Sequence, residues 1–410
     1  MRQLAKGEIM KLTIMLNCML LLVLFVAPAP VALASNIWYV NGLTGNNSYN
    51  CMSAQTACKT IGHAISLPSS GDTIKVAAAT YSELLTIPKS LSITIVGSGA
   101  LMTIIDGRGR GPVVLVHANS RVIISGVTIR NGHGLNGAGI SNFGVLTVSR
   151  SILVGNVAYG RCSGSGPCYG GAGGGVLNEG TMIISNSTIT QNAAEQCIGI
   201  FQIRCYGQGG GIWNTGTLTI NADTLSANFV DRGIGSGVFN DGGTVRVNNS
   251  TVSMNSGAPN VRGGALYNLV GSLTVNNSTV SNNNGGIFNQ EDQSTEIFQN
   301  AIVANNGVNC KGHPITSRGY NLSSDDTCNF NNTGDLNNTD PKLGTLGNYG
   351  GPTQTIPPLS GSPAIDAGNP GGCTDGAGHL LKTDQRGLPR PDREDKTGCD
   401  MGAYETQSLK

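Results

Sequence analysis

Apolar and polar residues alternate in short runs along most of this chain, and a longer pattern returns several times. Each copy has a run of small residues, an apolar pair ending in Asn, a Gly turn, an alternating apolar run, and Ser-Thr-apolar before a second Asn. The clearest copies are residues 173–192, 209–228 and 263–283. Alternation with a period of two predicts β-strands. A repeat this short cannot bury an apolar face alone, so the copies are expected to stack and share one core.

Three apolar runs per copy predict a coil with three faces, in which strands of successive copies pair in parallel about 4.8 Å apart. Leu146, Leu153 and Val176, with their equivalents in other copies, are expected to point inward. The two Asn positions are expected at corners, where amide side chains can hydrogen-bond from copy to copy. The two expected series are Asn142, Asn178, Asn214, Asn240, Asn268 and Asn289, and Asn156, Asn192, Asn228, Asn255, Asn283 and Asn305.

These patterns predict an all-β chain: one single-stranded, right-handed parallel β-helix, with three short strands per rung and about ten rungs. Residues 35–70 are expected to form an N-terminal cap that contains a short amphipathic helix in residues 59–66. The β-helix with its repeats is expected over residues 71–309. Residues 310–410 are expected to add C-terminal rungs and a second cap.

Residues 1–34 have the composition of a signal peptide. Lys11 supplies positive charge, residues 12–26 are apolar, and Ala32-Leu33-Ala34 is a small-x-small cleavage site. Cleavage after Ala34 predicts a protein that is secreted or associated with the extracellular surface. A signal anchor retained in the membrane is the alternative. No later segment is apolar enough to span a bilayer.

The number and spacing of the cysteines are those expected of an exported protein. Of 11 cysteines, Cys18 lies in the apolar leader, and the other ten form five pairs of near neighbours. An even number in an exported chain predicts disulfides, with nearest-neighbour pairing as the simplest connectivity. A metal site is the alternative, but CxxC spacing and a His pair are missing. The pairs are Cys51/Cys58, Cys162/Cys168, Cys197/Cys205, Cys310/Cys328 and Cys373/Cys399.

The low charge of the chain argues against certain classes of binding partner. Charged residues make up only 12% of the sequence and the net charge is +1. Nucleic acids and anionic membranes are bound through concentrated basic fields, so neither is expected as a partner. No cofactor and no metal are expected, and the sequence leaves the oligomeric state open.

Two groups of motifs resemble known families. The GG-[GA]-[ILV]-x-N and ST-x-x-x-N phrases resemble repeats of right-handed parallel β-helix proteins with the pectin-lyase-like fold. Toward the C-terminus, residues 340–343 (DPKL), NYGGPTQT, GSPAIDAGN, TDQRGLPRP and DMGAYE resemble the choice-of-anchor Q type of bacterial surface protein. This resemblance implies an exported surface protein. Because residues 406–410 contain no sorting motif, release or non-covalent retention at the surface is expected.

Parallel β-helices often carry polysaccharide lyases and hydrolases, so catalytic motifs have to be weighed. The strings Gly132-His133-Gly134, Asp325-Asp326 and Asn338-Thr339-Asp340 resemble those of polygalacturonases, in reversed order. Two carboxyl groups that cleave a sugar bond must lie roughly 5 to 10 Å apart. Opposite ends of a coil do not meet this requirement, so we interpret the strings as coincidental.

Charged residues are frequent in the tail. We interpret them as an ion-pair network that closes the far end of the core, with a metal or ligand site as the alternative. These residues are Asp366, Asp384, Arg386, Arg390, Asp392, Asp395, Asp400 and Glu405.

An aromatic residue precedes the first Asn in four consecutive copies: Trp213, Phe239, Tyr267 and Phe288. Because the preceding apolar residue faces inward, these four are expected to face outward as a strip that stacks on sugars. The alternative is a self-stacking ladder that only stabilises the coil. The leading hypothesis is thus a non-catalytic protein for adhesion or glycan binding, possible partners being polysaccharides or cell-surface glycans. The alternatives are a polysaccharide lyase or glycoside hydrolase, and a structural spacer.

Overall fold

The computed structural model describes residues 35–162, 168–195, 197–198, 204–257, 264–375, 378–392 and 398–407. Within this part, residues 36–407 belong to one compact unit whose regular elements are strands apart from one short helix. The expected signal peptide, with Lys11, Cys18 and Ala34, lies outside the described residues. Among the described residues, no helix has the length and apolarity needed to cross a membrane.

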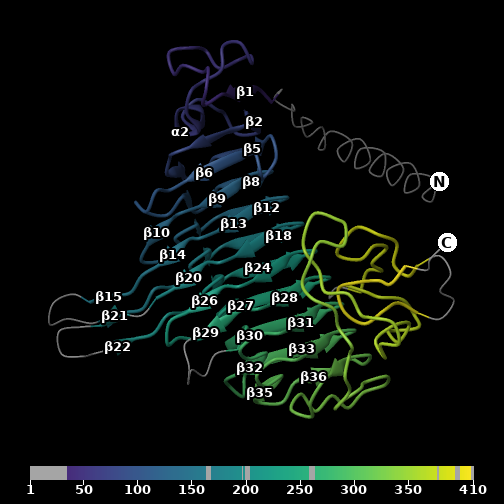
Figure 1. The fold of residues 1–410 in the computed structure, drawn as a ribbon. Helices are drawn as coiled ribbons and strands as arrows, with labels where there is room; N and C mark the ends of the chain where they lie inside the picture. Colours follow the sequence, from purple (N-terminus) through teal and green to yellow (C-terminus); the bar gives the residue numbers. More distant parts are fainter. Residues whose placement is uncertain are drawn as a thin grey trace, which may run out of the picture. The chain divides into compact units, whose positions relative to one another are not determined.

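The unit is a right-handed parallel β-helix with three main faces, as predicted (Figure 1). Face 1 contains β1 (Ile37–Val40), β2 (Asp72–Val76), β5 (Ser92–Gly97), β8 (Arg121–Ser125), β12 (Val145–Ser149), β18 (Thr181–Ser185), β24 (Thr217–Asn221), β33 (Thr295–Gln299) and β36 (Thr316–Ser317). Face 2 contains β3 (Ala79–Tyr81), β6 (Thr103–Asp106), β9 (Thr128–Arg130), β13 (Ile152–Val154), β19 (Thr188–Thr190), β25 (Thr224–Ser226), β28 (Thr251–Ser253), β31 (Thr279–Ser281), β34 (Ile302–Ala304) and β37 (Leu322–Ser323). Face 3 contains β4 (Leu85–Ile87), β7 (Val114–Val116), β11 (Ile140–Asn142), β17 (Val176–Asn178), β23 (Ile212–Asn214), β32 (Ile287–Asn289) and β35 (Cys310–Gly312).

Faces 1 and 3 join into one sheet in the middle of the coil. Strands β27 (Val238–Asn248) and β30 (Leu266–Asn276) run through the corner between these faces without a break. A short additional sheet extends the corner between faces 2 and 3, with two residues in each strand. Its strands are β10 (His133–Gly134), β14 (Val157–Ala158), β20 (Ala193–Ala194), β26 (Phe229–Val230) and β29 (Ser256–Gly257).

Two hairpins project from this corner, where residues 159–169 and 195–207 are insertions that lengthen the spacing between successive copies of the repeat. One pairs β15 (Arg161–Cys162) with β16 (Cys168–Tyr169), and the other pairs β21 (Cys197–Ile198) with β22 (Arg204–Cys205). In each hairpin the two cysteines are opposite each other on the backbone. The side chains of Cys162, Cys168 and Cys197 lie outside the described residues, and Cys205 is disulfide-bonded.

The core consists of the predicted inward columns. On face 1, Leu146, Met182, Leu218, Val245 and Leu273 are stacked in register, and each is at most 2% exposed. Burial of such aliphatic side chains supplies the main favourable free energy of the fold. Because every rung contributes to each column, the core is continuous along the coil.

Asparagine ladders line two corners, as predicted. In the first, each Nδ2 donates to the Oδ1 of the next Asn at 2.7–2.8 Å, from Asn142 to Asn268. Asn289 is in register with Asn268, as predicted, but its Oδ1 has no hydrogen-bond partner among the described residues, so the bonds of this ladder end at Asn268. In the second, equivalent bonds of 2.9–3.0 Å run from Asn156 through Asn283 to Asn306. The prediction that Asn305 continues this ladder is wrong. Asn305 is exposed with φ at +57°, and its neighbour Asn306 accepts the bonds from Asn283.

Substitution in the middle of the second ladder is expected to be costly. The Oδ1 of Asn192 accepts bonds from the backbone and side chain of Asn156, while its Nδ2 donates to Asn228 and to the carbonyl of Leu153. Asn192→Ala leaves several buried groups unpaired, at roughly 1–3 kcal/mol for each. Chemical denaturation measures the loss. Asn305→Gly is the control, expected within about 0.5 kcal/mol because Gly accepts a positive φ; equal losses for both variants would contradict the ladder.

The N-terminal rung carries the predicted short helix, α2 (Ile61–Ile65). Its Ile61, Ala64 and Ile65 are buried, and the helix contacts β1, β2 and β4. The disulfide Cys51–Cys58 lies beside it, with a Cα–Cα distance of 5.0 Å.

At the other end, residues from β35 onward close the core. The disulfide Cys310–Cys328 belongs to the apolar cluster, and the ring of Phe330 lies 5.8 Å from that of Phe298. The chain then turns back, and the tail lies against the outer side of face 2 over β25, β28 and β31 (Figure 1). The prediction that the tail's charged residues close the far end of the core is therefore wrong about their place. The outward side chains of these three strands are Thr and Ser, and the threonines Thr224, Thr251 and Thr279 hydrogen-bond to the tail.

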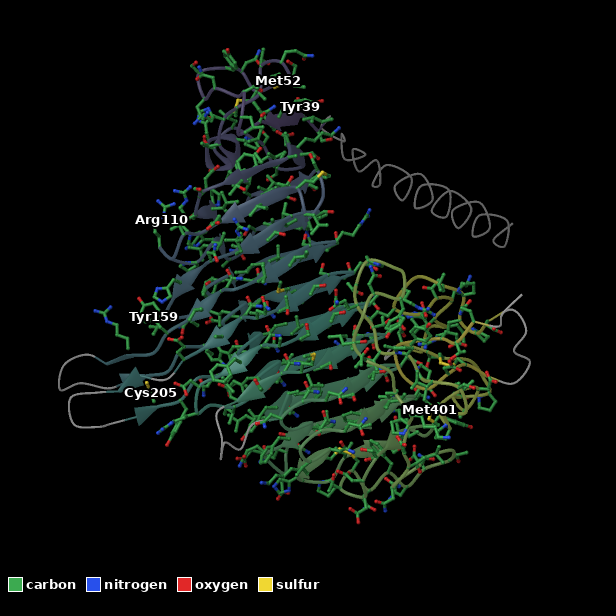
Figure 2. The ribbon with its side chains drawn as sticks, in the orientation of Figure 1. Tyr39, Met52, Arg110, Tyr159, Cys205 and Met401 are labelled. Carbon is green, nitrogen blue, oxygen red and sulfur yellow. A yellow bond between two sulfur atoms is a disulfide. The ribbon has the colours of Figure 1, made fainter. Side chains whose placement is uncertain are left out.

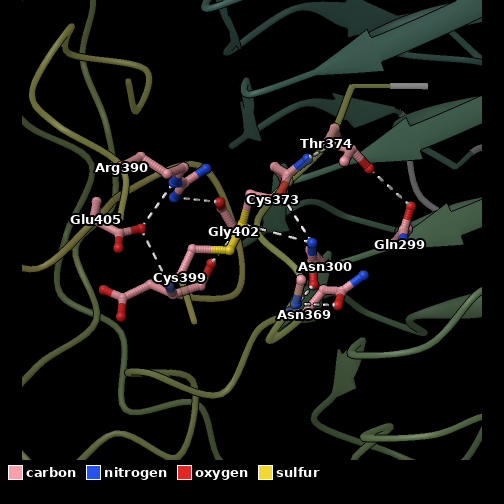
Figure 3. The surroundings of a disulfide bond; sticks show 12 residues. Gln299, Asn300, Asn369, Cys373, Thr374, Arg390, Cys399, Gly402 and Glu405 are labelled. Atoms are coloured by element: carbon pink, nitrogen blue, oxygen red, sulfur yellow. Dashed lines mark hydrogen bonds and ion pairs between the residues drawn. A yellow bond between two sulfur atoms is a disulfide. The ribbon is translucent and has the colours of Figure 1, made fainter. Parts of the chain in front are cut away.

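Gln385 is the centre of this contact. Its Nε2 lies 3.0 Å from both the carbonyl oxygen of Asp223 and the hydroxyl of Thr224, and its Oε1 accepts a bond of 2.6 Å from Thr251. The third predicted disulfide visible in the described residues, Cys373–Cys399, holds the tail together, with a Cα–Cα distance of 6.0 Å (Figure 3). It is anchored to the coil near Asn300, whose Oδ1 accepts a bond from the backbone of Asn369 at 2.9 Å.

Candidate functional site

The four aromatic residues singled out in the sequence lie on face 3 in register. Trp213 on β23 pairs with Phe239 on β27, which is followed by Tyr267 on β30 and Phe288 on β32. The ring centroids of Phe239 and Tyr267 are 5.6 Å apart, and those of Tyr267 and Phe288 are 4.7 Å apart. The structure thus brings the predicted residues together in one column.

Three members of the column do not form a solvent-facing strip. Phe239, Tyr267 and Phe288 are 0%, 5% and 8% exposed, so the prediction that they offer ring faces to a sugar is wrong. The rings point away from the core of the coil, as their register requires, but Ile234 and Leu269 pack against them. These three residues form the self-stacking ladder that was the alternative interpretation.

Trp213 differs from the other three because it is only partly buried and lines a pocket of about 490 Å³. Tyr206, which is 59% exposed, contributes a second aromatic ring, and the side chains of Asn136 and Gln208 contribute amides. We call this the Trp213 pocket. Its other lining residues are Leu135, Gly170, Ala172 and Cys205.

The turns between the short corner sheet and face 3 build this pocket. Parallel bridges stack Asn136, Ala172 and Gln208 on one another, so three successive rungs contribute to one wall. Gly170 approaches the backbone of Tyr206 so closely that a Cβ would overlap the carbonyl group of that residue. The pocket lies where the hairpins leave the coil, since Gly170 and Tyr206 directly follow β16 and β22.

The rim of the pocket carries a further aromatic pair. The rings of His133 and Tyr159 are stacked, with centroids 4.5 Å apart and planes 22° apart. The backbone of Tyr159 donates to the carbonyl of Gly134, next to the lining residue Leu135. Tyr159 and Cys205 lie along the same edge of the coil (Figure 2). The edge therefore offers two aromatic platforms on neighbouring rungs.

The pocket is lined by aromatic and amide residues rather than by acids and bases. Aromatic rings cover the apolar faces of sugars, and amides can both donate to and accept from hydroxyl groups. Nε1 of Trp213 is shielded from solvent and has no hydrogen-bond partner among the described residues, so contact with a ligand would come from the ring. None of the described lining residues is a carboxylate.

Trp213 was found from the sequence, whereas Tyr206, Gln208 and Asn136 were missed. Tyr206 lies in an insertion, outside the regular repeat. One signal was present: both insertions end in Cys-Tyr-Gly, at residues 168–170 and 205–207.

The polygalacturonase-like strings do not come together. His133 follows β9, and Asp325 follows β37, seven strands further along face 2, or about 34 Å at the usual strand spacing. Burial raises the pKa of Asp325, but hydrogen bonds from Thr327, Asn309 and Ser323 outweigh it and hold the pKa below its ordinary value. Asp340 likewise accepts from the backbone of Lys342 in a turn. These carboxylates have structural roles.

Four of the charged residues of the tail form buried ion pairs, in agreement with the preferred interpretation, whereas Asp395 lies outside the described residues. Arg390 donates to Glu405 at 2.8 Å, and Arg386 lies 2.7 Å from Asp384 (Figure 3 shows the first pair). Burial raises the pKa of Glu405 to about 7 and also raises that of Asp400. Both ion pairs are almost completely shielded from solvent, so a soluble substrate does not reach them.

One group of side chains has the geometry of a metal site but not the chemistry. Sγ of Cys51 and Cys58 lies near His63, yet both sulfurs belong to a disulfide and provide no thiolate.

Comparison with solved structures supports the pectin-lyase-like β-helix fold. The chain is similar to pectate lyase Pel9A, with 14% identity and a TM-score of 0.53, over 91% of this chain and 97% of that one. It is also similar to XylC, solved in complex with xylose, with 9% identity and a TM-score of 0.51, over 90% of this chain and 98% of that one. Identities this low show the fold alone. No protein-family model and no curated protein matches the chain.

Proposed function

We propose that this protein is an exported, non-catalytic polysaccharide-binding protein that uses the Trp213 pocket. The observation that carries the proposal is the meeting of two aromatic rings, Trp213 and Tyr206, with the amides of Asn136 and Gln208 around a cavity of about 490 Å³. Such a combination of apolar faces and convergent polar groups is typical of small-molecule sites. The neighbouring Tyr159 extends the aromatic surface beyond the pocket.

Export and surface location are part of this proposal. The apolar leader of residues 1–34 and the disulfides of the coil support it, because disulfides persist in oxidising compartments. The C-terminal motifs support assignment to the choice-of-anchor Q type of bacterial surface protein. Two residues of the TDQRGLPRP motif make contacts that hold the tail. Gln385 hydrogen-bonds to Thr224 on face 2, and Arg390 donates to Glu405.

Tryptophan fluorescence tests this function directly, because the chain has only two tryptophans. Trp38 is structural, with Nε1 donating to Asp72 at 2.9 Å, and Trp38→Phe leaves Trp213 as the sole emitter. We expect oligosaccharides to shift or quench this emission. Tyr206→Ala is expected to weaken binding about fivefold, since loss of one aromatic contact costs about 1 kcal/mol.

Tyr49→Ala is the matched control, because Tyr49 is 45% exposed and belongs to the N-terminal segment. It should leave binding unchanged. Equal effects of the two tyrosine variants, or no response of Trp213 to any glycan, would reject the pocket as the site. Product release from polysaccharide substrates would support the lyase or hydrolase alternative.

A further inference from the structure

The described lining of the Trp213 pocket contains no charged side chain. This matters because binding of an acidic polymer requires cations that face the ligand, with little competition from the protein. Rings and amides instead suit hydroxyl groups and apolar ring faces. From this we infer that the ligand is a neutral saccharide chain, and not a uronate or sulfated polymer; this inference rests on the proposed function.

Two of the arginines toward the N-terminal part of this edge reach solvent but are held by acceptors of the protein. Nε of Arg130 is 2.9 Å from Oδ2 of Asp106, which also accepts from the side chain of Asn131. The guanidinium of Arg110 donates to the carbonyls of Ser82 and Gly107, at 3.1 and 3.4 Å. Arg110 lies along the same edge as Tyr159 (Figure 2). An acidic polymer would have to displace these contacts before either arginine could bind it.

The positions of the two aromatic platforms indicate the direction in which a bound saccharide chain would lie. Tyr206 and Trp213 belong to the pocket, while Tyr159 is stacked on His133 at the rim, toward the N-terminal rungs. Because successive rungs are about 4.8 Å apart, a ligand that contacts both platforms must run along the axis of the coil. We therefore expect an oligosaccharide of two or more units to bind better than a monosaccharide.

The test is a titration of the Trp38→Phe protein with four probes: cello-, xylo- and chito-oligosaccharides, which are neutral, and oligogalacturonate, which is acidic. Each is titrated at 50 and 500 mM NaCl while Trp213 emission is followed. Salt screens charge–charge attraction, so uronate binding would weaken steeply and neutral binding would not. We expect at least one neutral oligosaccharide to bind, with less than a twofold change in affinity between the two salt concentrations.

The outcomes separate this inference from the proposed function. Binding of oligogalacturonate alone, weakened tenfold or more by salt, would overturn the neutral ligand and leave polysaccharide binding intact. Absence of any response would overturn both. Tyr159→Ala should weaken a neutral oligosaccharide severalfold and leave its monosaccharide unaffected, whereas equal effects on both would contradict binding along the axis. Tyr49→Ala again serves as the control.

Discussion

Replacing Glu296 with leucine is expected to raise the free energy of unfolding by several kcal/mol at pH 8. Glu296 lies on β33 directly after Leu273 in the inward column of face 1, and it is 2% exposed. Neither carboxylate oxygen has a hydrogen-bond partner among the described residues. An isolated charge in such a place is very unfavourable, so burial raises the pKa of Glu296 to about 8.

The pH dependence of this effect has a definite sign. In the unfolded chain the carboxyl ionises near its ordinary pKa of 4.5, whereas in the folded protein it keeps its proton up to about pH 8. Folding therefore binds a proton between these values, and stability decreases as pH rises from about 4.5 to 8. The difference of about 3.5 units corresponds to about 5 kcal/mol at most, of which little is lost at pH 5.

Urea denaturation at pH 5 and pH 8 measures the prediction. The advantage of Glu296→Leu over the natural protein should be small at pH 5 and large at pH 8. Glu296→Gln is the control for charge: it should remove the same pH dependence while keeping a polar group in the core. An advantage of Glu296→Leu that is equal at both pH values would mean that the carboxyl does not ionise abnormally.

Arg390→Met is expected to destabilise the tail strongly. The Arg390 side chain is fully buried and donates to Glu405 at 2.8 Å, to Oδ1 of Asn249 at 3.0 Å and to the carbonyl of Gly402 at 2.9 Å. Removing one partner of a buried ion pair costs about 3–5 kcal/mol, because the other charge stays buried without compensation. Lysine is not a conservative replacement, since it lacks the planar fork that reaches three acceptors.

Limited proteolysis of the tail and urea denaturation together measure this effect. Faster cleavage within residues 343–407 is expected, with the Trp213 emission unchanged because the pocket lies on a different corner. Arg318→Met is the control, since Arg318 is exposed, and it should change stability by less than about 0.5 kcal/mol. If Arg390→Met is cleaved no faster and is no less stable in urea than Arg318→Met, the buried network does not hold the tail in place.

The regular part of the fold could be predicted because identical positions recur along the sequence. The inward columns and the two Asn series follow from that recurrence, and the register of the strands confirms them. Asn305 and Asn306 are adjacent, so the pattern alone did not decide which of them enters the ladder. That choice depends on the backbone of the turn, where Asn305 adopts a positive φ.

Tertiary contacts between distant segments were harder to predict. The repeat shows that Phe239, Tyr267 and Phe288 point away from the core, but it contains no information on what covers them. Similarly, the composition of the tail predicted ion pairs but not their place, because Gln385 binds residues such as Asp223, 162 positions earlier. The Trp213 pocket was only partly predicted for the same reason, since Tyr206 comes from an insertion without a counterpart in most rungs.

The contact of the tail with face 2 affects the order in which the turns of the coil unfold. In a solenoid each turn contacts only its neighbours, so turns can be lost one at a time from either end. Here the tail binds β25, β28 and β31 together, and it follows the last turn in the chain. Before turns at the C-terminal end can unfold, the contacts of the tail with these three strands must break. We therefore expect unfolding by heat or force to begin at the N-terminal turns. The turns that contact the tail should unfold together as one cooperative unit.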